Sequence, residues 1–213
     1  MGSTGEKLRD RLLARQPAVI VVDMQNDFCH SDGALGRRGL DLGAVQAVGS
    51  SLVGFLDVVR ASTPIIFIKT HHDDWTDARA WTGRQEGDAL GICRTGGWGA
   101  EFYAVTPASQ DRVVIKHRYD GFFGTDLDLI LRARQVDTVV MTGVTTNVCV
   151  ESTARQAFFH GYRLVLAADL TAALSPAEHA ASLYSLETYF DAVTADAHAI
   201  AQVLSGRNRL GGN

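Results

Sequence analysis

The sequence lacks the features that mark membrane, secreted and nucleic-acid-binding proteins. No apolar run approaches the ~18 residues that cross a bilayer, and the N-terminal stretch MGSTGEKLRDRLL lacks the apolar segment of a secretory signal. We therefore predict a cytoplasmic protein without a membrane partner. Positive charge is not in excess either, because 20 Lys and Arg residues stand against 24 Asp and Glu residues and are scattered along the chain. A nucleic-acid backbone would find no basic surface, so a small molecule is the expected partner.

Cysteine is scarce, and its spacing argues against a structural role in pairs. Cys29, Cys93 and Cys149 lie far apart, which favours neither a disulfide framework nor a C-x-x-C metal site. Any cysteine that matters here would act alone, as a thiol.

The chain of 213 residues, 46% of them apolar, is long enough to bury one sizeable core. Leu8 and Leu12 stand one helical turn apart and predict a short surface helix over residues 5–15, before Pro17. We therefore expect three parts: a helical extension at 1–16, a domain at 17–205 and a C-terminal tail at 206–213.

Short apolar runs alternate with helical segments through the expected domain. The runs are typical of strands covered on both faces and lie at 18–22, 64–70, 112–116, 138–143, 163–169 and, more weakly, 191–194. Helices are expected at 42–61, at 126–134 after Thr125 as the N-cap, at 147–160 before Gly161, and at 176–190 after a capping box at Ser175–Glu178. This alternation predicts a three-layer, doubly wound α/β fold with a mainly parallel sheet of about six strands and helices on both faces.

One segment, from residue 71 to 107, has no clear periodicity. It carries six glycines together with Trp75, Trp81 and Trp98, and loops of this length often serve as lids over active sites. Its arginines, Arg79, Arg84 and Arg94, either clamp a substrate carboxylate or are simply solvated.

Three polar residues fall at or just beyond the ends of predicted strands: Asp23, Lys116 and Cys149. Each alone has a structural explanation, as a turn cap, a solvated cation and a small buried side chain. Ligands in this fold gather at the carboxyl ends of strands, where all three would meet. A thiol needs a base or a positive field before it attacks a carbonyl. Asp23 can take the proton, Lys116 can stabilise the thiolate, and backbone N–H groups of the turn at 143–147 can bind an oxyanion.

Three ordered blocks of the sequence resemble those of the isochorismatase-like cysteine hydrolases. They are VVDMQNDF at 21–28, the Lys116 strand followed by RYDGFFGT, and TGVTTNVCVESTAR at 142–155, and the resemblance covers residues 18–200. It implies a catalytic triad of Asp23, Lys116 and Cys149. It also implies an oxyanion hole from the backbone N–H groups of Thr145 and Cys149, a cis peptide at Val144–Thr145, and assembly into homodimers or homotetramers.

Within the family, the sequence is most similar to the amidase branch. Isochorismate hydrolases act on a vinyl ether and lack the cysteine, whereas ureidoacrylate, biuret and N-carbamoyl amidohydrolases share the blocks around Lys116 and Cys149. The resemblance implies hydrolysis of a terminal C–N bond with release of ammonia. Residues expected to form the pocket walls are Phe28, His72, Tyr119 and Phe122, with core packing as the alternative for the two phenylalanines.

No cofactor is expected. Nicotinamidases of this family hold a metal through an Asp and two His residues with a D-x-H pattern, whereas this chain has His71-His72-Asp73-Asp74. Adjacent residues at a strand end point to opposite faces, so the two histidines cannot easily meet one ion. No metal site is therefore expected.

Three alternatives stay open at this point. Residues 149–155 also spell the C-x5-R pattern of cysteine phosphatases, although the intervening VESTA has no glycine to open a phosphate cradle. The second alternative is a binding module that keeps the fold but has lost catalytic activity. The presence of all three polar residues speaks against it, because an inactive site would be free to lose any of them. A hydrolase of a vinyl ether or of another acyl group is the third.

Overall fold

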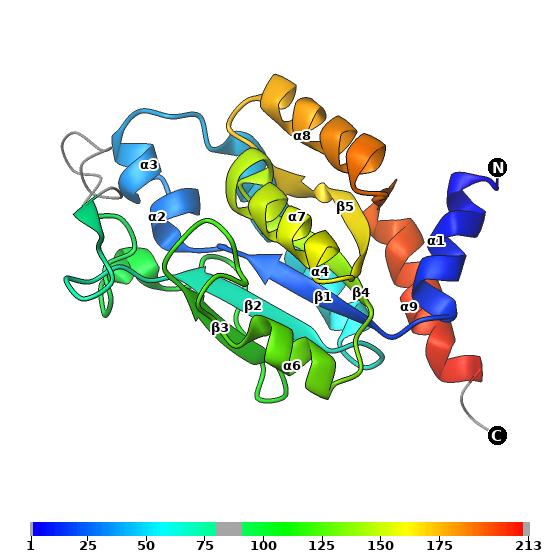
Figure 1. The fold of residues 1–213 in the computed structure, drawn as a ribbon. Helices are drawn as coiled ribbons and strands as arrows, with labels where there is room; N and C mark the ends of the chain where they lie inside the picture. The colour runs from blue at the N-terminus through cyan, green and yellow to red at the C-terminus, as the bar shows by residue number, and fades with distance from the viewer. Residues whose placement is uncertain (1, 80–90, 211–213) are drawn as a thin grey trace.

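A parallel sheet runs through the centre of the molecule (Figure 1). The structure, a computed structural model, describes residues 2–79 and 91–210. Within them the sheet has six strands in the order β3-β2-β1-β4-β5-β6, and every neighbouring pair is parallel. The strands are β1 (Pro17–Val22), β2 (Ile65–Thr70), β3 (Arg112–Lys116), β4 (Thr138–Val144), β5 (Arg163–Ala172) and β6 (Val193–Ala195). This confirms the predicted doubly wound α/β fold.

Helices cover both faces of the sheet, and alternate side chains of β1 divide between them. Val19 and Val21 belong to the core beneath α1 (Thr4–Leu13), α4 (Gly43–Val59) and α9 (Ala197–Leu210). Ile20 and Val22 belong to the core beneath α6 (Leu127–Ala133), α7 (Glu151–Phe159) and α8 (Pro176–Tyr189), which lie in front of the sheet in Figure 1. Burial on both faces explains why the strands are almost continuously apolar.

The strand order places a switch point between β1 and β4. From β1 the chain moves outward through β2 to β3, and then returns to the other side of β1 to form β4. The loops after β1 and β4 therefore diverge at the carboxyl ends of the strands. Open α/β sheets bind their ligands in the crevice at such a switch point.

The N-terminal helix is anchored rather than merely lying on the surface. Leu8 and Leu12 are buried in the same core as α9, and Arg11 Nη2 lies 2.5 Å from Asp191 Oδ2. The expected boundary at residue 205 falls inside α9, a helix that the sequence did not predict. None of the described helices combines the length and apolar content of a membrane span.

Two helix starts differ from expectation. The helix expected after Thr125 has Asp126 as its N-cap and begins at Leu127, whose N–H lies 3.2 Å from Thr125 Oγ1. Ser175 is the N-cap of α8 as expected, but its side chain accepts no capping hydrogen bond. The predicted capping box is therefore wrong, and Pro176 at the first helical position remains as the start signal.

The segment after β2 folds back over the carboxyl ends of the strands. Gln25 Nε2 donates to Thr70 O at 2.9 Å and to Ala100 O at 2.8 Å, while Gln25 Oε1 accepts from Thr70 N at 2.7 Å. Ala100 closes the short 3₁₀ helix η2 (Trp98–Ala100). One buried amide thus fastens this segment to the ends of β1 and β2.

Candidate active site

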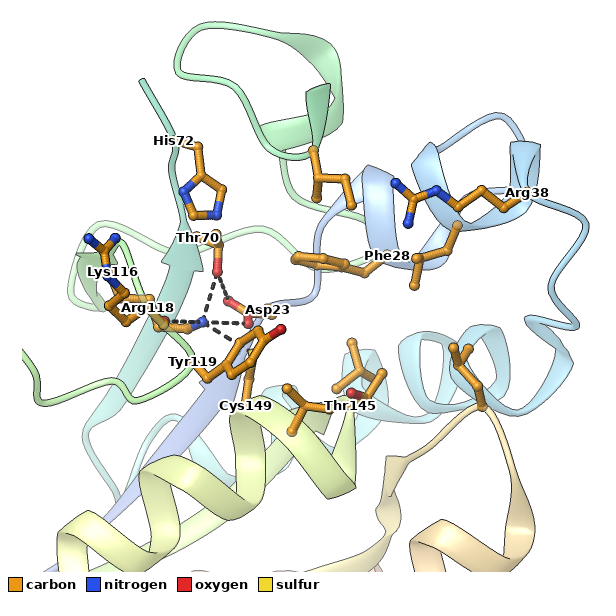
Figure 2. A pocket seen from close by; sticks show the side chains of 15 residues that line it. Asp23, Phe28, Arg38, Thr70, His72, Lys116, Arg118, Tyr119, Thr145 and Cys149 are labelled. Atoms are coloured by element: carbon orange, nitrogen blue, oxygen red, sulfur yellow. Dashed lines mark hydrogen bonds and ion pairs between the residues drawn. The ribbon is translucent and has the colours of Figure 1, made fainter. Parts of the chain in front are cut away.

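The carboxyl ends of three strands bring Asp23, Lys116 and Cys149 together, as expected (Figure 2). Asp23 follows β1, Lys116 is the last residue of β3, and Cys149 lies in η3 (Thr146–Val150), the π-helical turn that links β4 to α7. Asp23 and Lys116 are each 1% exposed, and Cys149 is 8% exposed. A buried carboxylate and a buried ammonium require each other as partners.

The ammonium of Lys116 is the centre of this group. Its Nζ lies 2.8 Å from Asp23 Oδ2, 3.0 Å from Arg118 O and 3.3 Å from Cys149 Sγ. It also donates to Thr70 Oγ1 at 2.8 Å, and that hydroxyl donates to Asp23 Oδ1 at 3.0 Å. An ammonium has three protons, so these acceptors share them, and the sulfur stands within the positive field.

Thr70 was not predicted from the sequence to be a site residue. Its signal was the register of the sheet, because Thr70 pairs with Lys116 across β2 and β3. Thr70 Oγ1 donates to Oδ1 of Asp23, whereas the partner of Oδ2 among the described residues is the ammonium of Lys116, 2.8 Å away. Asp23 therefore keeps one oxygen able to receive a proton.

Burial sets the protonation states of the thiol and the ammonium. It raises the pKa of the Cys149 thiol; the charge of Lys116 opposes this rise, and the charge of Asp23 adds to it. Burial alone would lower the pKa of Lys116, but the negative charge of Asp23, 2.8 Å away, outweighs this effect, so the pKa of Lys116 is raised. The resting site therefore holds a neutral thiol beside a charged ammonium.

Position 143, near the end of β4, accommodates only glycine. Gly143 has φ +97°, and a Cβ there would lie 2.1 Å from Val22 O and 2.5 Å from Val22 N. The chain thus comes close to β1 immediately before the turn that carries Cys149. The structure has a cis peptide at Val144–Thr145, the position where the resemblance places one.

The turn that carries Cys149 is braced by α8. Thr146 Oγ1 lies 2.9 Å from His179 Nδ1, and Ser182 Oγ donates to Thr146 O at 3.2 Å. Thr145 O accepts from Val148 N and from Val150 N, both at 3.2 Å, so the first hydrogen bonds of η3 pass over the N–H of Cys149. Thr145 and Cys149 both face the pocket.

The thiol opens onto a pocket of about 240 Å³, a size suited to a small molecule. The residues around it are Asp23, Phe28, Leu35, Arg38, Thr70, His72, Ile92, Lys116, Arg118, Tyr119, Val144, Thr145, Val148, Cys149 and Leu174. Phe28, His72 and Tyr119, which were predicted from the sequence to form pocket walls, are among them (Figure 2).

The same expectation for Phe122 is wrong. Its ring stacks on His160, with centroids 4.9 Å apart, and on Tyr162 at 5.9 Å. It belongs to the core beneath α6 and α7 and does not line the pocket. The alternative of core packing holds for Phe122.

Neither Arg79 nor Arg94 lines the pocket, so neither is placed to clamp a substrate carboxylate. Arg94 Nη1 lies 2.5 Å from Asp77 Oδ2 and its Nη2 lies 2.8 Å from Asp74 Oδ1, so it ties the loop to itself. Arg79 is exposed and does not line the pocket. Arg84 and Trp81 lie outside the described residues. Among the described residues, the guanidinium groups that line the pocket are those of Arg38 and Arg118, neither of which was predicted from the sequence to be a site residue.

The residues after β2 do not fit the metal-binding pattern of nicotinamidases. Within residues 2–79 and 91–210, no three His, Cys, Asp or Glu side chains are grouped as ligands for one ion. His72 Nδ1 lies 3.6 Å from Asp77 Oδ1, but Asp77 already pairs with Arg94. Burial lowers the pKa of both His71 and His72, which keeps the two rings neutral at neutral pH.

The phosphatase alternative fails on the position of Arg155. Arg155 Nε donates to Glu151 Oε1 at 2.9 Å, and its Nη2 donates to Ser185 Oγ of α8 at 2.8 Å. The guanidinium therefore faces α8 instead of forming a cradle with Cys149.

Comparison with known proteins agrees with this geometry. A family model of the isochorismatase domain matches residues 17–198. The chain belongs to the isochorismatase family. This confirms the resemblance found in the three sequence blocks.

Curated members of the isochorismatase family resemble the chain over most of its length. The ureidoacrylate amidohydrolase of Klebsiella pneumoniae subsp. pneumoniae is 34% identical over 210 residues, covering 90% of this chain and 88% of that protein. The ureidoacrylate amidohydrolase of Stutzerimonas stutzeri is 37% identical over 194 residues, covering 83% and 78%.

Solved structures of isochorismatase-like enzymes share the fold. A cysteine hydrolase from Pseudomonas syringae pv. phaseolicola is 28% identical with a TM-score of 0.81, covering 90% of this chain and 93% of that one. N-carbamoylsarcosine amidase from Thermoplasma acidophilum is 28% identical with a TM-score of 0.71, covering 85% and 96%. These similarities identify this isochorismatase family member as a cysteine-dependent amidohydrolase of non-peptide C–N bonds. The vinyl-ether and catalytically silent alternatives are not favoured.

Proposed function

We propose that the protein removes the terminal nitrogen of a small ureido, carbamoyl or primary amide compound as ammonia, with Cys149 as the nucleophile. The observation that carries the proposal is the position of Lys116 Nζ, 2.8 Å from Asp23 Oδ2 and 3.3 Å from Cys149 Sγ, at the base of a small pocket. Two of the similar proteins are named for a ureido and an N-carbamoyl substrate. That class of substrate fits the size of the pocket.

The first step activates the thiol. Because burial raises the pKa of the Cys149 thiol, the sulfur attacks only as its proton leaves. Asp23 Oδ2 receives that proton, since Thr70 already occupies Oδ1. Lys116 stays protonated and stabilises the negative charge on sulfur as it develops.

Attack on the carbonyl forms a C–S bond and moves one electron pair onto the carbonyl oxygen. The backbone N–H groups of Thr145 and Cys149, at the start of η3, are the proposed donors to this oxyanion. These donors stabilise the oxyanion effectively because the backbone holds them in place before the reaction begins. The positive end of the helical segment formed by η3 and α7 adds to the same effect.

Collapse of the tetrahedral intermediate breaks the C–N bond. Asp23 gives its proton to the departing nitrogen, which leaves as ammonia, and the acyl group remains on Cys149. A water molecule then attacks this S-acyl intermediate and transfers a proton to Asp23. When the C–S bond breaks, that proton returns to sulfur, and the starting state is restored.

The walls of the pocket suit a planar amide or urea. Phe28 and Tyr119 offer aromatic faces, and His72, kept neutral by its lowered pKa, offers a ring that carries no charge. A flat substrate can lie between these rings while its edges form hydrogen bonds.

Ammonia release from a panel of ureido acids, biuret and simple amides tests the proposed function. We expect at least one ureido or carbamoyl compound to release one ammonia per molecule, with a kcat/KM in the ordinary enzyme range above about 10⁴ M⁻¹s⁻¹ for the preferred substrate. Absence of ammonia release by the wild-type protein across the whole panel would refute the proposal.

Alkylation of Cys149 by iodoacetamide tests, independently of turnover, whether Lys116 stabilises the Cys149 thiolate. The charge of Lys116 lowers the pKa of the Cys149 thiol, so Lys116→Met is expected to move the pH profile of alkylation upward. Cys29 and Cys93 are both 0% exposed and serve as internal references. An unchanged pH profile would show that Lys116 has only a structural role.

Cytoplasmic location and assembly into homodimers or homotetramers stay predictions. They rest on the sequence and on the resemblance to the family.

A further inference from the structure

Three cationic side chains from the described part of the chain line the pocket, and two of them bind other groups of the protein. Lys116 is paired with Asp23 at 2.8 Å. Arg118 donates from Nη1 and Nη2 to Thr76 O, both at 3.1 Å, and from Nη1 to His117 O at 2.6 Å. These two cations hold the site and its loop in place. Arg38 is the third.

Arg38 differs from both because its guanidinium has no partner in the described part of the chain. Its backbone N–H bonds to the preceding turn, but no described residue forms an ion pair or hydrogen bond with its side chain. Among the described residues, Asp23 is the one carboxylate that lines the pocket, and it is paired with Lys116. Within residues 2–79 and 91–210, no other acidic side chain of the pocket competes for Arg38.

The backbone that carries Arg38 is held firmly. Arg38 is the C-cap of α3 (Ala34–Arg37), and the start of α3 is fixed by Asp27, whose Oδ1 accepts from Ala34 N at 2.9 Å. Asp27 Oδ2 accepts from Cys93 N at 2.6 Å, which ties α3 to the segment that carries Ile92. The buried Asp27 lies only four residues after Asp23, so the place of Arg38 is set relative to the triad.

The arrangement of the pocket separates the two charged ends. Figure 2 shows Asp23, Lys116 and Cys149 grouped on one side, and Arg38 reaching from α3 toward the pocket on the other side, beyond Phe28. Leu35 lines the same pocket from α3. A ligand with its amide carbon at Cys149 would thus direct its distal end toward Arg38.

From this geometry we infer that Arg38 binds a carboxylate at the distal end of the substrate, so that the substrate class is small ureido acids. This inference rests on the proposed function. A guanidinium binds a carboxylate through two parallel N–H···O bonds and is less costly to desolvate than an ammonium. Arg38 would then select acids over neutral ureas of the same length, while the triad acts on the ureido group of either.

The test compares two substrates that differ only in the distal group, 3-ureidopropionate and propylurea. Arg38→Gln is expected to lower kcat/KM for the acid by about 10- to 100-fold, mainly through KM, because a charge-assisted pair is lost. For the neutral urea the change is expected to stay below about threefold. Arg38→Lys keeps the charge but not the fork, and should recover part of the loss for the acid.

Arg37 provides a matched control on the same helix. Like Arg38 it is exposed, but its Nη1 donates to Asp32 O and it does not line the pocket. Arg37→Gln removes the same charge from the neighbouring position and is expected to leave kcat/KM for both substrates unchanged. Equal losses in Arg37→Gln and Arg38→Gln would indicate a general effect of surface charge and would overturn the inference.

Other outcomes separate this inference from the proposed function. If the wild type releases ammonia from both substrates and Arg38→Gln affects them equally or not at all, Arg38 does not read the carboxylate, and the proposed function stands. If the wild type hydrolyses neither substrate, the affinity for 3-ureidopropionate tests whether Arg38 binds the carboxylate. Calorimetric titration of 3-ureidopropionate into Cys149→Ala and into Cys149→Ala/Arg38→Gln should then give a Kd about 10- to 100-fold weaker in the double variant. Equal Kd values would overturn the inference.

Discussion

Replacing Cys149 by alanine is expected to lower kcat for ammonia release by at least about 10⁴-fold, because the variant has no atom that can form the S-acyl intermediate. The side chain lies at the base of the pocket and is almost fully buried, so its loss removes little contact area from a substrate. Substrate affinity, measured by calorimetry, should stay near that of the wild type. Activity of Cys149→Ala within tenfold of the wild type would exclude Cys149 as the nucleophile.

Cys29 is a matched control for this substitution. It is as buried as a side chain can be, lies outside the pocket, and burial raises the pKa of its thiol to about 12, which leaves it unreactive. Cys29→Ala should reduce thermal stability through the small cavity it creates. It should leave kcat near the wild-type value, which separates loss of the nucleophile from loss of any buried cysteine.

Asp23→Asn is expected to lower kcat by about 10²- to 10⁴-fold, the contribution of a well-placed acid–base group. Asparagine has nearly the same shape but cannot receive the thiol proton or deliver one to ammonia. The charge of Asp23 raises the pKa of the Cys149 thiol. The alkylation profile of Asp23→Asn should therefore move to lower pH, even though turnover falls.

The opposite directions make this pair of variants diagnostic. Lys116→Met should move the alkylation profile upward, Asp23→Asn should move it downward, and both should lose turnover. A variant that had simply unfolded would expose Cys29 and Cys93 as well, and all three thiols would react near the ordinary pKa. A downward shift with undiminished kcat in Asp23→Asn would show that Asp23 carries no proton in the reaction.

The strands and the triad were predictable from the sequence because each leaves a local signal. A run such as Ala18–Val22 is apolar because helices cover both of its faces, and a polar residue after such a run marks the edge where ligands bind. Asp23, Lys116 and Cys149 all carry that signal. Their meeting then follows from the parallel order of the strands.

The rest depended on contacts between distant segments. Thr70 became visible only through its pairing with Lys116, and Arg38 through the buried Asp27 that fixes α3. Helices of four residues, such as α3, are too short to show a period. Phe122 was misplaced because the sequence block after Lys116 does not determine which way a ring points, and this ring stacks on His160 and Tyr162.

The most direct measurement is mass spectrometry of the protein after acid quench during steady-state hydrolysis of a slow ureido or amide substrate. The account predicts that the peptide carrying Cys149 gains the mass of the substrate less one ammonia. The peptides of Cys29 and Cys93 should stay unmodified, and the adduct should be absent from Cys149→Ala. An adduct on a different residue, or unimpaired hydrolysis by Cys149→Ala, would contradict the account.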